Sequence, residues 1–324
     1  MSLTAYDPDR TTLNDIAWLH AFRLQTNAER FRVRSQCLSG GTRVTDCGTS
    51  VVGGLEAGRQ LAEVCLAGLG RVAIVPADRQ LWAGPAITVQ TDHPIGACMA
   101  SQYAGWQLKG EKFFAMGSGP MRAAANREPL FVDIGYVEQP NRVVGVLETS
   151  KLPTDEIAAQ IASACHVTLE NVHLLTARTA SLAGTVQVVA RSVETALHKL
   201  HELKFDLKKV VSGYGVAPLP PIAKDDLTAI GWTNDAVLYG GEVTLWVQGD
   251  DEELHALGPQ VPSSASADFG EPFAQIFHRY NGDFYKIDPL LFSPAVVTFV
   301  NLSSGRTHRF GTLQPGVLQQ WLRG

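Results

Sequence analysis

Strand patterns and helical patterns alternate along the whole chain, and tight turns join several of the strands. Turn residues flanked by alternating apolar positions predict β-hairpins around Ser39–Gly41, Gly240–Gly241 and Ser303–Gly305. Further strands are predicted over residues 71–75, 85–91, 131–135, 142–150 and 171–177. Helices are predicted over residues 14–31, 155–165, 185–203 and 273–280, with another that ends at Gly68 or Gly70. Because hairpins recur between the helices, the pattern favours an α+β (mixed α/β) fold over a doubly wound parallel sheet.

The length and the low charge content predict a large core and two domains. A chain of 324 residues has the size at which one core tends to split. Hydrophobic residues make up 45% and charged residues only 18%, which indicates little disorder and much surface buried between domains or subunits. We expect one domain over residues 1–140, with a hairpin and glycine-rich loops, and a second over residues 141–324 that carries the 185–203 helix. The C-terminal segment could pack back on the first domain.

Charge, hydropathy and cysteine usage exclude several partners. The net charge is −5 and no Lys/Arg cluster occurs, which argues against a nucleic-acid groove. No apolar run approaches the ~20 residues that span a bilayer, and residues 1–15 lack the pattern of a signal peptide. The five cysteines include no CxxC pair, which is typical of reduced, mostly buried thiols. We therefore expect a cytoplasmic protein without nucleic-acid or membrane partners.

The segment 185–203, TVQVVARSVETALHKLHEL, concentrates more chemistry than any other helical pattern in the chain. At 100° per residue its valines and leucines share one face, and Gln187, Arg191, Glu194 and His198 line the opposite face. This polar stripe has two interpretations. It is either a solvated face with an ion pair worth about 0.2–0.5 kcal/mol or a functional stripe.

Two further blocks could contact a ligand. Gly54 and Glu56 lie in a glycine-rich stretch, residues 53–58, which can bring a ligand close to the backbone but matches no nucleotide-binding motif; a tight structural turn is the alternative. Asp92 and His93 follow a predicted strand, where ligand sites often lie. Capping of the next helix is the favoured interpretation for Asp92, and the role of His93 stays open.

Two more blocks combine small and polar residues. Gly117, Ser118 and Gly119 precede a predicted helix over 121–126, so their backbone N–H groups could cradle an anion, or they could simply start the helix. Asn234 and Asp235 precede a predicted strand, where a turn is the commoner interpretation of such a pair.

Other chemistries lack support in the sequence. The nine histidines form no HxxxH or HExxH, so no metal site is predicted, and His198 and His201 are better explained as a helical surface pair. No GxSxG elbow occurs, and neither Cys65 nor Cys98 has a base next to it in the sequence, so a serine or cysteine nucleophile is unsupported.

Taken in order, seven blocks between about residue 10 and residue 315 resemble the methenyltetrahydromethanopterin cyclohydrolase family. The blocks are VTDCG, GGLEAGRQLAEVCLAGLG, VQTDHPIGACMASQYAGWQL, FFAMGSGPMRA, TASLAGTVQVVARSVETALHKL, WTNDAVLYGGEV and FYKIDPLLFSPA. The resemblance is to a bacterial member, in which the enzyme serves formaldehyde oxidation to formate. It implies two domains with the substrate pocket in the cleft between them, a homotrimer, and no metal or prosthetic group.

The resemblance also implies the reaction and its residues. The reaction is the reversible hydrolysis of a 5,10-methenyl pterin to the 5-formyl pterin, and the ARxVET motif of the family matches Arg191 and Glu194. Tyr103 stands where archaeal members carry a lysine, which changes the charge available in the pocket. We expect Glu194 to act as general base and then acid, and Arg191 to orient it or to bind the developing carbonyl oxygen. The glycine-rich and polar residues named above are the candidates for holding the pterin. The alternatives are a non-catalytic pterin-binding subunit and another one-carbon transfer enzyme on the same pterin.

Overall fold

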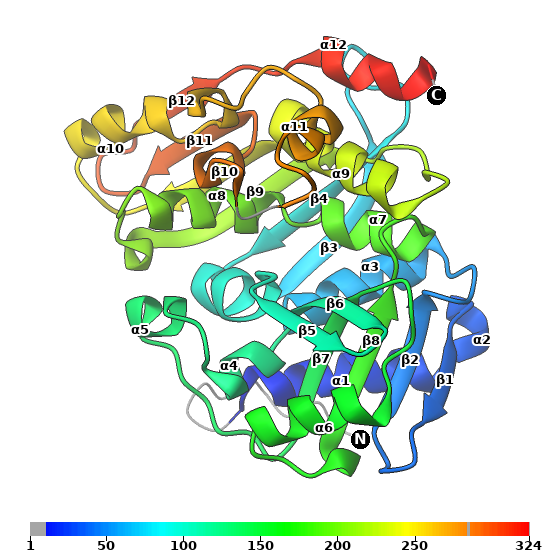
Figure 1. Ribbon diagram of the computed structural model, residues 1–324. Helices are drawn as coiled ribbons and strands as arrows, with labels where there is room; N and C mark the ends of the chain where they lie inside the picture. Colours follow the sequence, from blue (N-terminus) through cyan, green and yellow to red (C-terminus); the bar gives the residue numbers. More distant parts are fainter. Residues whose placement is uncertain (1–10, 284–285, 324) are drawn as a thin grey trace.

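Two six-stranded mixed sheets, with helices around and between them, make up the protein (Figure 1). The structure is a computed structural model that describes residues 11–283 and 286–323. The expected mixed α+β fold is confirmed. Residues 1–10, which carry most of the expectation about a signal peptide, and Phe284 and Tyr285 of the last resembling block lie outside the described residues.

The lower sheet of Figure 1 has the order β1-β2-β8-β7-β6-β5, in which β2, β8 and β7 are parallel and the other neighbours antiparallel. Its strands are β1 (Arg34–Cys37), β2 (Arg43–Gly48), β5 (Trp106–Gly110), β6 (Phe113–Ser118), β7 (Val143–Glu148) and β8 (Val172–Ala177). The upper sheet has the order β12-β11-β10-β9-β4-β3, in which only β10 and β11 are parallel. Its strands are β3 (Gly70–Pro76), β4 (Pro85–Thr91), β9 (Val210–Pro218), β10 (Glu242–Val247), β11 (Val296–Asn301) and β12 (Thr307–Gly311).

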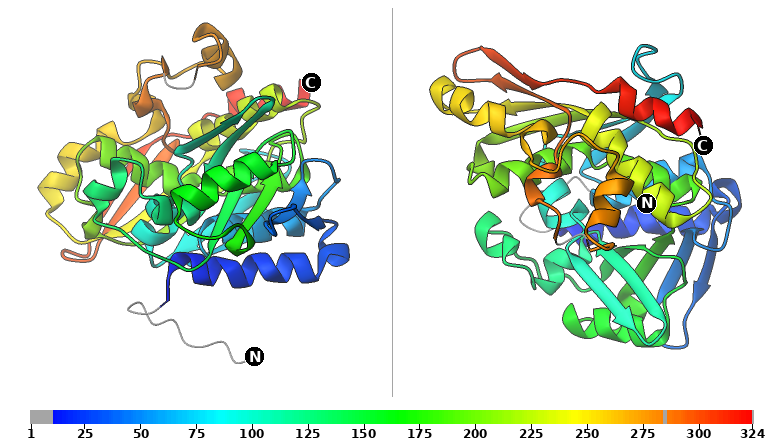
Figure 2. Two further views of the ribbon diagram at one scale, coloured as in Figure 1. Left: turned by 60° about the horizontal axis from the view of Figure 1, so that its bottom comes forward. Right: turned by 45° about the horizontal axis from the view of Figure 1, so that its top comes forward.

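The helices cover both faces of the lower sheet and connect it to the upper one. The α-helices are α1 (Leu13–Thr26), α2 (Ala28–Phe31), α3 (Leu55–Cys65), α4 (Met121–Ala125), α5 (Leu130–Ile134), α6 (Asp155–Ala164), α7 (Leu182–Val189), α8 (Ser192–Glu202), α9 (Asp226–Gly240), α10 (Asp251–Leu257), α11 (Phe273–Arg279) and α12 (Pro315–Leu318). Helix α1 lies on one side of the lower sheet and α6 on the other (Figure 2, left).

Alternation along the strands explains this two-sided packing. On β7, Val143 and Leu147 belong to the core under α6, whereas Val144 and Val146 face the core that contains α1 and α3. That second core continues through α7 and α8 to Leu245 and Phe299 of the upper sheet. The helices α7 and α8 therefore lie in the middle of the molecule, with packed elements on every side.

The domain boundary expected near residue 140 stays a prediction. Both sheets take strands from either side of it, since β2 and β6 pair with β8 and β7, and β4 pairs with β9. A two-domain arrangement would accordingly group residues by sheet and not by position in the sequence.

Two expected elements are wrong. The predicted strand 131–135 is helix α5, and the hairpin around Gly240–Gly241 is the end of helix α9 followed by β10. In α9 four consecutive residues, 236–239, are all buried, because neighbouring elements enclose the helix on several sides and hide its periodicity. The helix expected over residues 14–31 is confirmed in part. Helix α1 begins at Leu13, with Thr12 as its N-cap, and ends at Thr26, and the short helix α2 follows.

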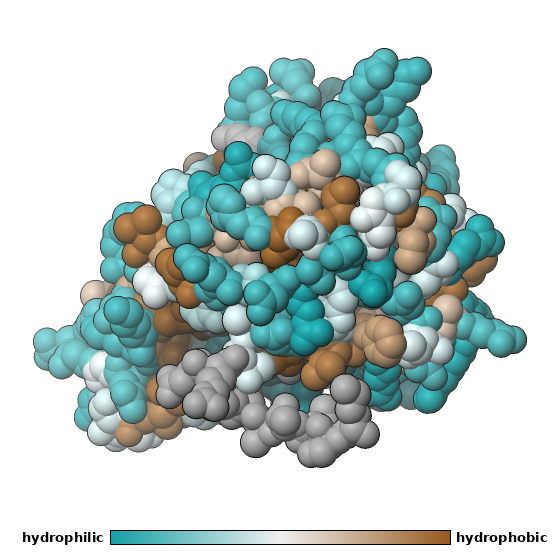
Figure 3. Space-filling model, turned by 90° about the horizontal axis from the view of Figure 1, so that it is seen from below, coloured by the Kyte–Doolittle hydropathy of each residue, from teal (hydrophilic) through white to brown (hydrophobic). Residues whose placement is uncertain are grey.

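The hairpin expected around Ser39–Gly41 is confirmed for β1 and β2. The hairpin around Ser303–Gly305 is confirmed for β11 and β12. Within the part of the chain that the structure describes, no helix combines the length and apolar character needed to cross a membrane. Seen from below, the surface is mostly hydrophilic, with small separate groups of apolar side chains (Figure 3).

Candidate active site

The predicted helix 185–203 is interrupted at Ala190 and Arg191. Helix α7 ends at Val189, α8 begins at Ser192, and Arg191 has φ −94° and ψ 8°, outside regular helix geometry. Three members of the polar stripe are buried: Arg191 is 8% exposed, Glu194 5% and Gln187 2%. The solvated-face interpretation is therefore wrong for these three residues.

Arg191 is held by groups from four separate elements, α3, the π-helix over Ile95–Gln102, β6 and α7. Its Nη2 donates to Gln187 Oε1 at 3.0 Å, to Ser118 Oγ at 3.1 Å and to Cys65 Sγ at 3.5 Å, while Nη1 donates to the backbone carbonyl of Gln102. Such multiple donation by a planar guanidinium fixes its orientation. None of these hydrogen bonds goes to Glu194, so Arg191 acts on that carboxyl group through its charge and not by direct contact.

Glu194 is a buried carboxyl group between positive charges. Burial raises its pKa from 4.5 to about 7, against the opposing influence of the Arg191 and Arg122 guanidinium groups. Burial also raises the pKa of the Cys98 thiol, and the nearby Glu194 carboxylate raises it further. Glu194 can therefore exchange a proton near neutral pH, whereas Cys98 stays a neutral thiol.

A π-helix, Ile95–Gln102, lies against α8 and leads directly into Tyr103. The backbone carbonyl of Gln102, the last residue of this helix, accepts a hydrogen bond from Arg191. The Gln102 side chain donates to Ala190 O at 3.0 Å, in the break between α7 and α8. The Tyr103 ring stacks on the His198 ring with a centroid separation of 5.1 Å. Burial lowers the pKa of His198, so its imidazole is neutral at pH 7. π-Helices such as Ile95–Gln102 are rare and frequently mark functional sites.

The Gly117–Gly119 segment joins this cluster, but not as an anion cradle. Gly117 and Ser118 lie in β6 and pair with the neighbouring strands, and the N–H of Gly119 donates to Ser101 O at 2.8 Å. Ser118 instead contributes its hydroxyl group to Arg191. Gly119 has φ +87°, a conformation that favours glycine, and this lets the chain turn from β6 into α4.

The remaining predicted ligand residues lie elsewhere. Gly54 precedes α3 and Glu56 lies in its first turn, about 14–17 Å along the helix from Cys65 at its other end. Glu56 forms an ion pair of 2.6 Å with Arg59. Asp92 accepts a hydrogen bond from Ser212 Oγ at 2.7 Å and caps no helix, so the capping interpretation is wrong; His93 is exposed beside it, at the start of the π-helix.

Asn234 and Asp235 lie inside α9 and form no turn. The Asn234 amide donates to Ile230 O at 2.8 Å within the same helix, and Asp235 accepts from the N–H of Phe273 at 2.7 Å. Burial raises the pKa of Asp235 to about 7. These contacts tie α9 to α11. The roles of Asn234 and Asp235 as substrate ligands stay predictions, as do those of Gly54, Glu56, Asp92 and His93.

Sequence reasoning missed Gln102, Arg122 and the two thiols of the cluster. Gln102 and Arg122 stand in the resembling blocks, but neither has a periodic or motif-based signal, because the π-helix and the turn at Gly119 place them. Cys65 and Cys98 were judged only for a neighbouring base in the sequence. Among the described residues, no group of three or more His, Cys, Asp or Glu is arranged to hold a metal ion.

Comparisons with known proteins are consistent across nearly the whole chain. A family model described as Cyclohydrolase (MCH) matches residues 12–321. A protein named methenyltetrahydromethanopterin cyclohydrolase from Methylobacillus flagellatus is 46% identical over 297 residues, covering 92% of this chain and 91% of that protein. Proteins of the same name from Rhodopirellula baltica and Methanococcoides burtonii are 47% and 43% identical. The first match covers 86% of each chain, and the second covers 90% of this chain and 91% of the relative.

Proposed function

This chain belongs to the methenyltetrahydromethanopterin cyclohydrolase family, and from that premise we propose that Glu194 and Arg191 carry its reaction. The enzyme hydrolyses 5,10-methenyltetrahydromethanopterin reversibly to the 5-formyl pterin. The observation that supports the assignment best is the burial of one carboxyl group with a pKa of about 7 beside two guanidinium groups.

The substrate is an amidinium cation that is electrophilic at the bridging carbon. Glu194, when ionised, removes a proton from water as the water oxygen bonds to that carbon, which gives a neutral tetrahedral adduct. Glu194 then returns the proton to N10 as the carbon–N10 bond breaks, and the adduct hydroxyl loses its proton to solvent as the formyl carbonyl forms. The balance is one cation and one water consumed, and one formyl pterin and one proton released. A pKa near 7 suits a group that must work in both directions.

Arg191 is the donor suited to the new carbonyl oxygen. Its guanidinium group is fixed by Gln187, Ser118 and Gln102, so it needs no rearrangement as charge develops on that oxygen. A fixed cation beside a cationic substrate would weaken binding unless a carboxylate balanced it. Glu194 supplies that balance.

The test uses the methenyl near-UV band in the absence of any redox cofactor. The wild-type protein should remove the band and form the 5-formyl product, and Glu194→Gln should bind without turnover, a loss of ~10²–10⁴ in rate. Glu253→Gln, which alters an ion pair with Lys209 far along the chain, is the control and should keep full activity. Tight binding by the wild-type protein with an unchanged band would instead identify a non-catalytic pterin-binding subunit. A folded Glu194→Gln variant with near-normal activity would refute the assignment of the base.

We further propose that the protein works without a metal or prosthetic group, in the cytoplasm, and in formaldehyde oxidation to formate, as the resemblance to bacterial members implies. We propose a homotrimer for the same reason. The low charged fraction of 18% supports an extensive subunit interface. Light scattering should give three times the chain mass of 35.0 kDa, and activity should survive extensive dialysis against a chelator.

A further inference from the structure

Arg122, on helix α4, is the largest side chain that is fully buried, at 1% exposure, and the proposed mechanism does not use it. A buried guanidinium group is costly unless several partners compensate it. Glu128 supplies one compensation, since both of its carboxylate oxygens accept from Arg122, Oε1 at 2.8 Å from Nε. Arg122 also lies over the ring of Phe131 on α5, 5.3 Å from its centroid. Three further links lead from Arg122 to the active site.

The first of these contacts is the end of the π-helix. Nη1 of Arg122 donates to Met99 O at 3.1 Å and to Ser101 O at 3.3 Å. The next carbonyl, that of Gln102, accepts a hydrogen bond from Arg191. The last carbonyl groups of a helix lack partners within the helix. Here two arginines from different elements fill three of these positions, so the end of the π-helix bridges Arg122 and Arg191.

The second contact is with Tyr103. The Arg122 guanidinium carbon lies 4.9 Å from the centroid of the Tyr103 ring, the same ring that stacks on His198 of α8. A cation over an aromatic face is attracted to it, most strongly where water is excluded. Arg122 thus helps to hold Tyr103 in place against His198.

The third link is electrostatic. The charged and titratable groups around Glu194 are Arg191 at the start of α8, Arg122 from α4 and Cys98 from the π-helix; His198 follows one turn later, and Cys65 of α3 lies against Arg191. Of these, Arg122 and Arg191 are the two whose positive charge lowers the pKa of Glu194 against the effect of burial. Both thiols are buried and His198 is neutral at pH 7, so the two arginines supply the positive charge.

We propose that Arg122 is a positioning residue for the reaction. It fixes the end of the π-helix, which presents Gln102 to Arg191 and Tyr103 to His198, and it supplies the second positive charge that Glu194 faces. Glu128, which pairs with the Arg122 guanidinium group, modulates this charge. The inference rests on the proposed role of Glu194 as the base.

Two substitutions should shift the pH dependence of kcat in opposite directions. Arg122→Met removes a positive charge, so the midpoint should rise and the rate at pH 6, relative to the plateau of that variant, should fall about 3-fold or more. Glu128→Gln leaves Arg122 in place without its negative partner, so the midpoint should fall and the relative rate at pH 6 should increase. A residue that only supports the fold would not produce shifts of opposite sign.

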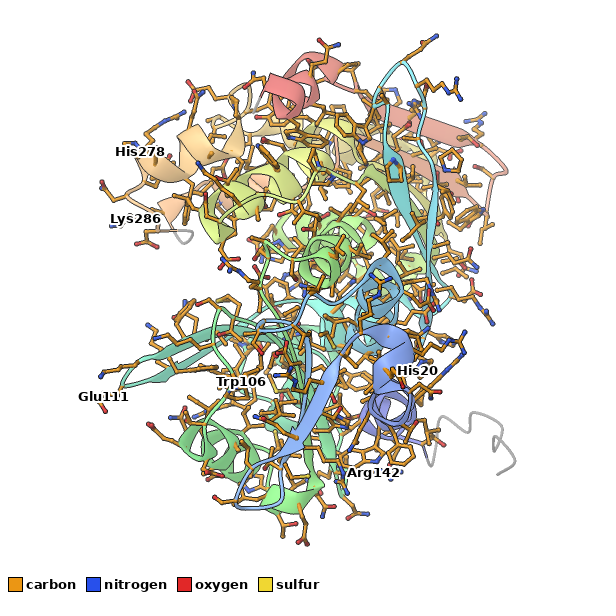
Figure 4. All side chains as sticks on the ribbon, turned by 90° about the vertical axis from the view of Figure 1, so that its right-hand side faces the viewer. His20, Trp106, Glu111, Arg142, His278 and Lys286 are labelled. Carbon is orange, nitrogen blue, oxygen red and sulfur yellow. The ribbon has the colours of Figure 1, made fainter. Side chains whose placement is uncertain are left out.

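Arg142→Met is the control, because Arg142 also pairs with a carboxylate, Asp15 at 2.9 Å, and also lies over an aromatic ring, Trp18 at 5.4 Å. Figure 4 shows Arg142 well apart from Trp106, which lines a surface cavity of about 180 Å³ together with Arg122 and Glu128. The control should keep the wild-type midpoint. If Arg122→Met does not fold, the double variant Arg122→Met/Glu128→Gln removes the pair together, and its midpoint should also rise.

A second readout separates this inference from the proposed function. The carboxyl band of Glu194 can be titrated by infrared difference spectroscopy between each variant and the same variant carrying Glu194→Gln, which requires no turnover. Opposite shifts in that titration support the role of Arg122 even if Glu194 proves not to be the base. Unchanged midpoints in Arg122→Met and Glu128→Gln, with lower unfolding temperatures alone, would overturn it.

Discussion

Glu194→Gln should stabilise the protein at neutral and alkaline pH while it abolishes turnover. Burial raises the pKa of Glu194 from 4.5 to about 7, so the folded state binds more protons than the unfolded state between these values. Stability is therefore lost as pH rises through this window, and the full cost applies above pH 7. At ~1.36 kcal/mol per unit, ionised Glu194 costs the folded protein about 1 kcal/mol at pH 5 and about 3 kcal/mol at pH 8. Glutamine has the same shape and no such cost.

The assay is thermal unfolding of the wild-type protein and the variant at pH 5 and pH 8. With ~2.1 cal/mol/K of unfolding entropy per residue, 3 kcal/mol in a chain of 324 residues corresponds to about 4 °C at pH 8, against about 1 °C at pH 5. Glu253→Gln, at an exposed ion pair with Lys209, should show no such growth with pH. A stability difference that is the same at both pH values, or that favours the wild-type protein at pH 8, would refute the account of Glu194 as a buried carboxyl group with a raised pKa.

Three further outcomes follow from the same structure. The kcat of wild-type hydrolysis should rise with the ionisation of Glu194, so initial rates at pH 6 should be ~10-fold below the plateau above pH 8, and a flat profile would exclude this residue as the base. Arg191→Lys keeps the charge but loses the planar donors that bind Ser118 and Gln187. The kcat should therefore fall ~10-fold or more, with little change in the midpoint of its pH dependence. A large shift of that midpoint would contradict this role of the planar donors. Gly53→Ala should destabilise the protein in urea unfolding by several times the ~1 kcal/mol expected for Gly135→Ala. Both glycines have φ +65°, but only at Gly53 would the new methyl group lie 2.1 Å from a carbonyl oxygen, that of Cys47. Equal losses of unfolding free energy in the two variants would contradict this.

Local sequence patterns were sufficient to predict the helices and strands that expose one face to solvent. The hairpin β1–β2, the strands β3 and β4 and the helix α6 all alternate or repeat in the way their packing requires, and they could be predicted from the sequence. Helix α9 could not, because residues 236–239 are all buried and the alternation read across Gly240–Gly241 has no counterpart in its packing. Elements enclosed on all sides lose the periodicity on which such predictions depend.

The same limit applies to the active site. The sequence shows that Arg191 and Glu194 share a helical face, but not that this face is buried. Burial comes from Ser118, from the π-helix ending at Gln102 and from Arg122, which are 69 to 92 residues away in the chain and have no motif of their own. Only the resemblance to a family predicts that the pair is catalytic.

The break in the helix at Arg191 bears on the pKa of Glu194. A continuous helix would carry the arginine and the carboxyl group on one stripe, three residues apart, where they could pair directly. In the structure the backbone leaves helical geometry at Arg191, and its guanidinium group binds Gln102, Ser118 and Gln187 in place of Glu194. A direct ion pair would hold the pKa of Glu194 low and make it a poor base near neutral pH. With the two groups separated, the charge of Arg191 still limits the effect of burial on the pKa of Glu194. In the proposed mechanism, a pKa of about 7 suits a glutamate that accepts a proton and returns it, and the irregularity in the helix is consistent with that value.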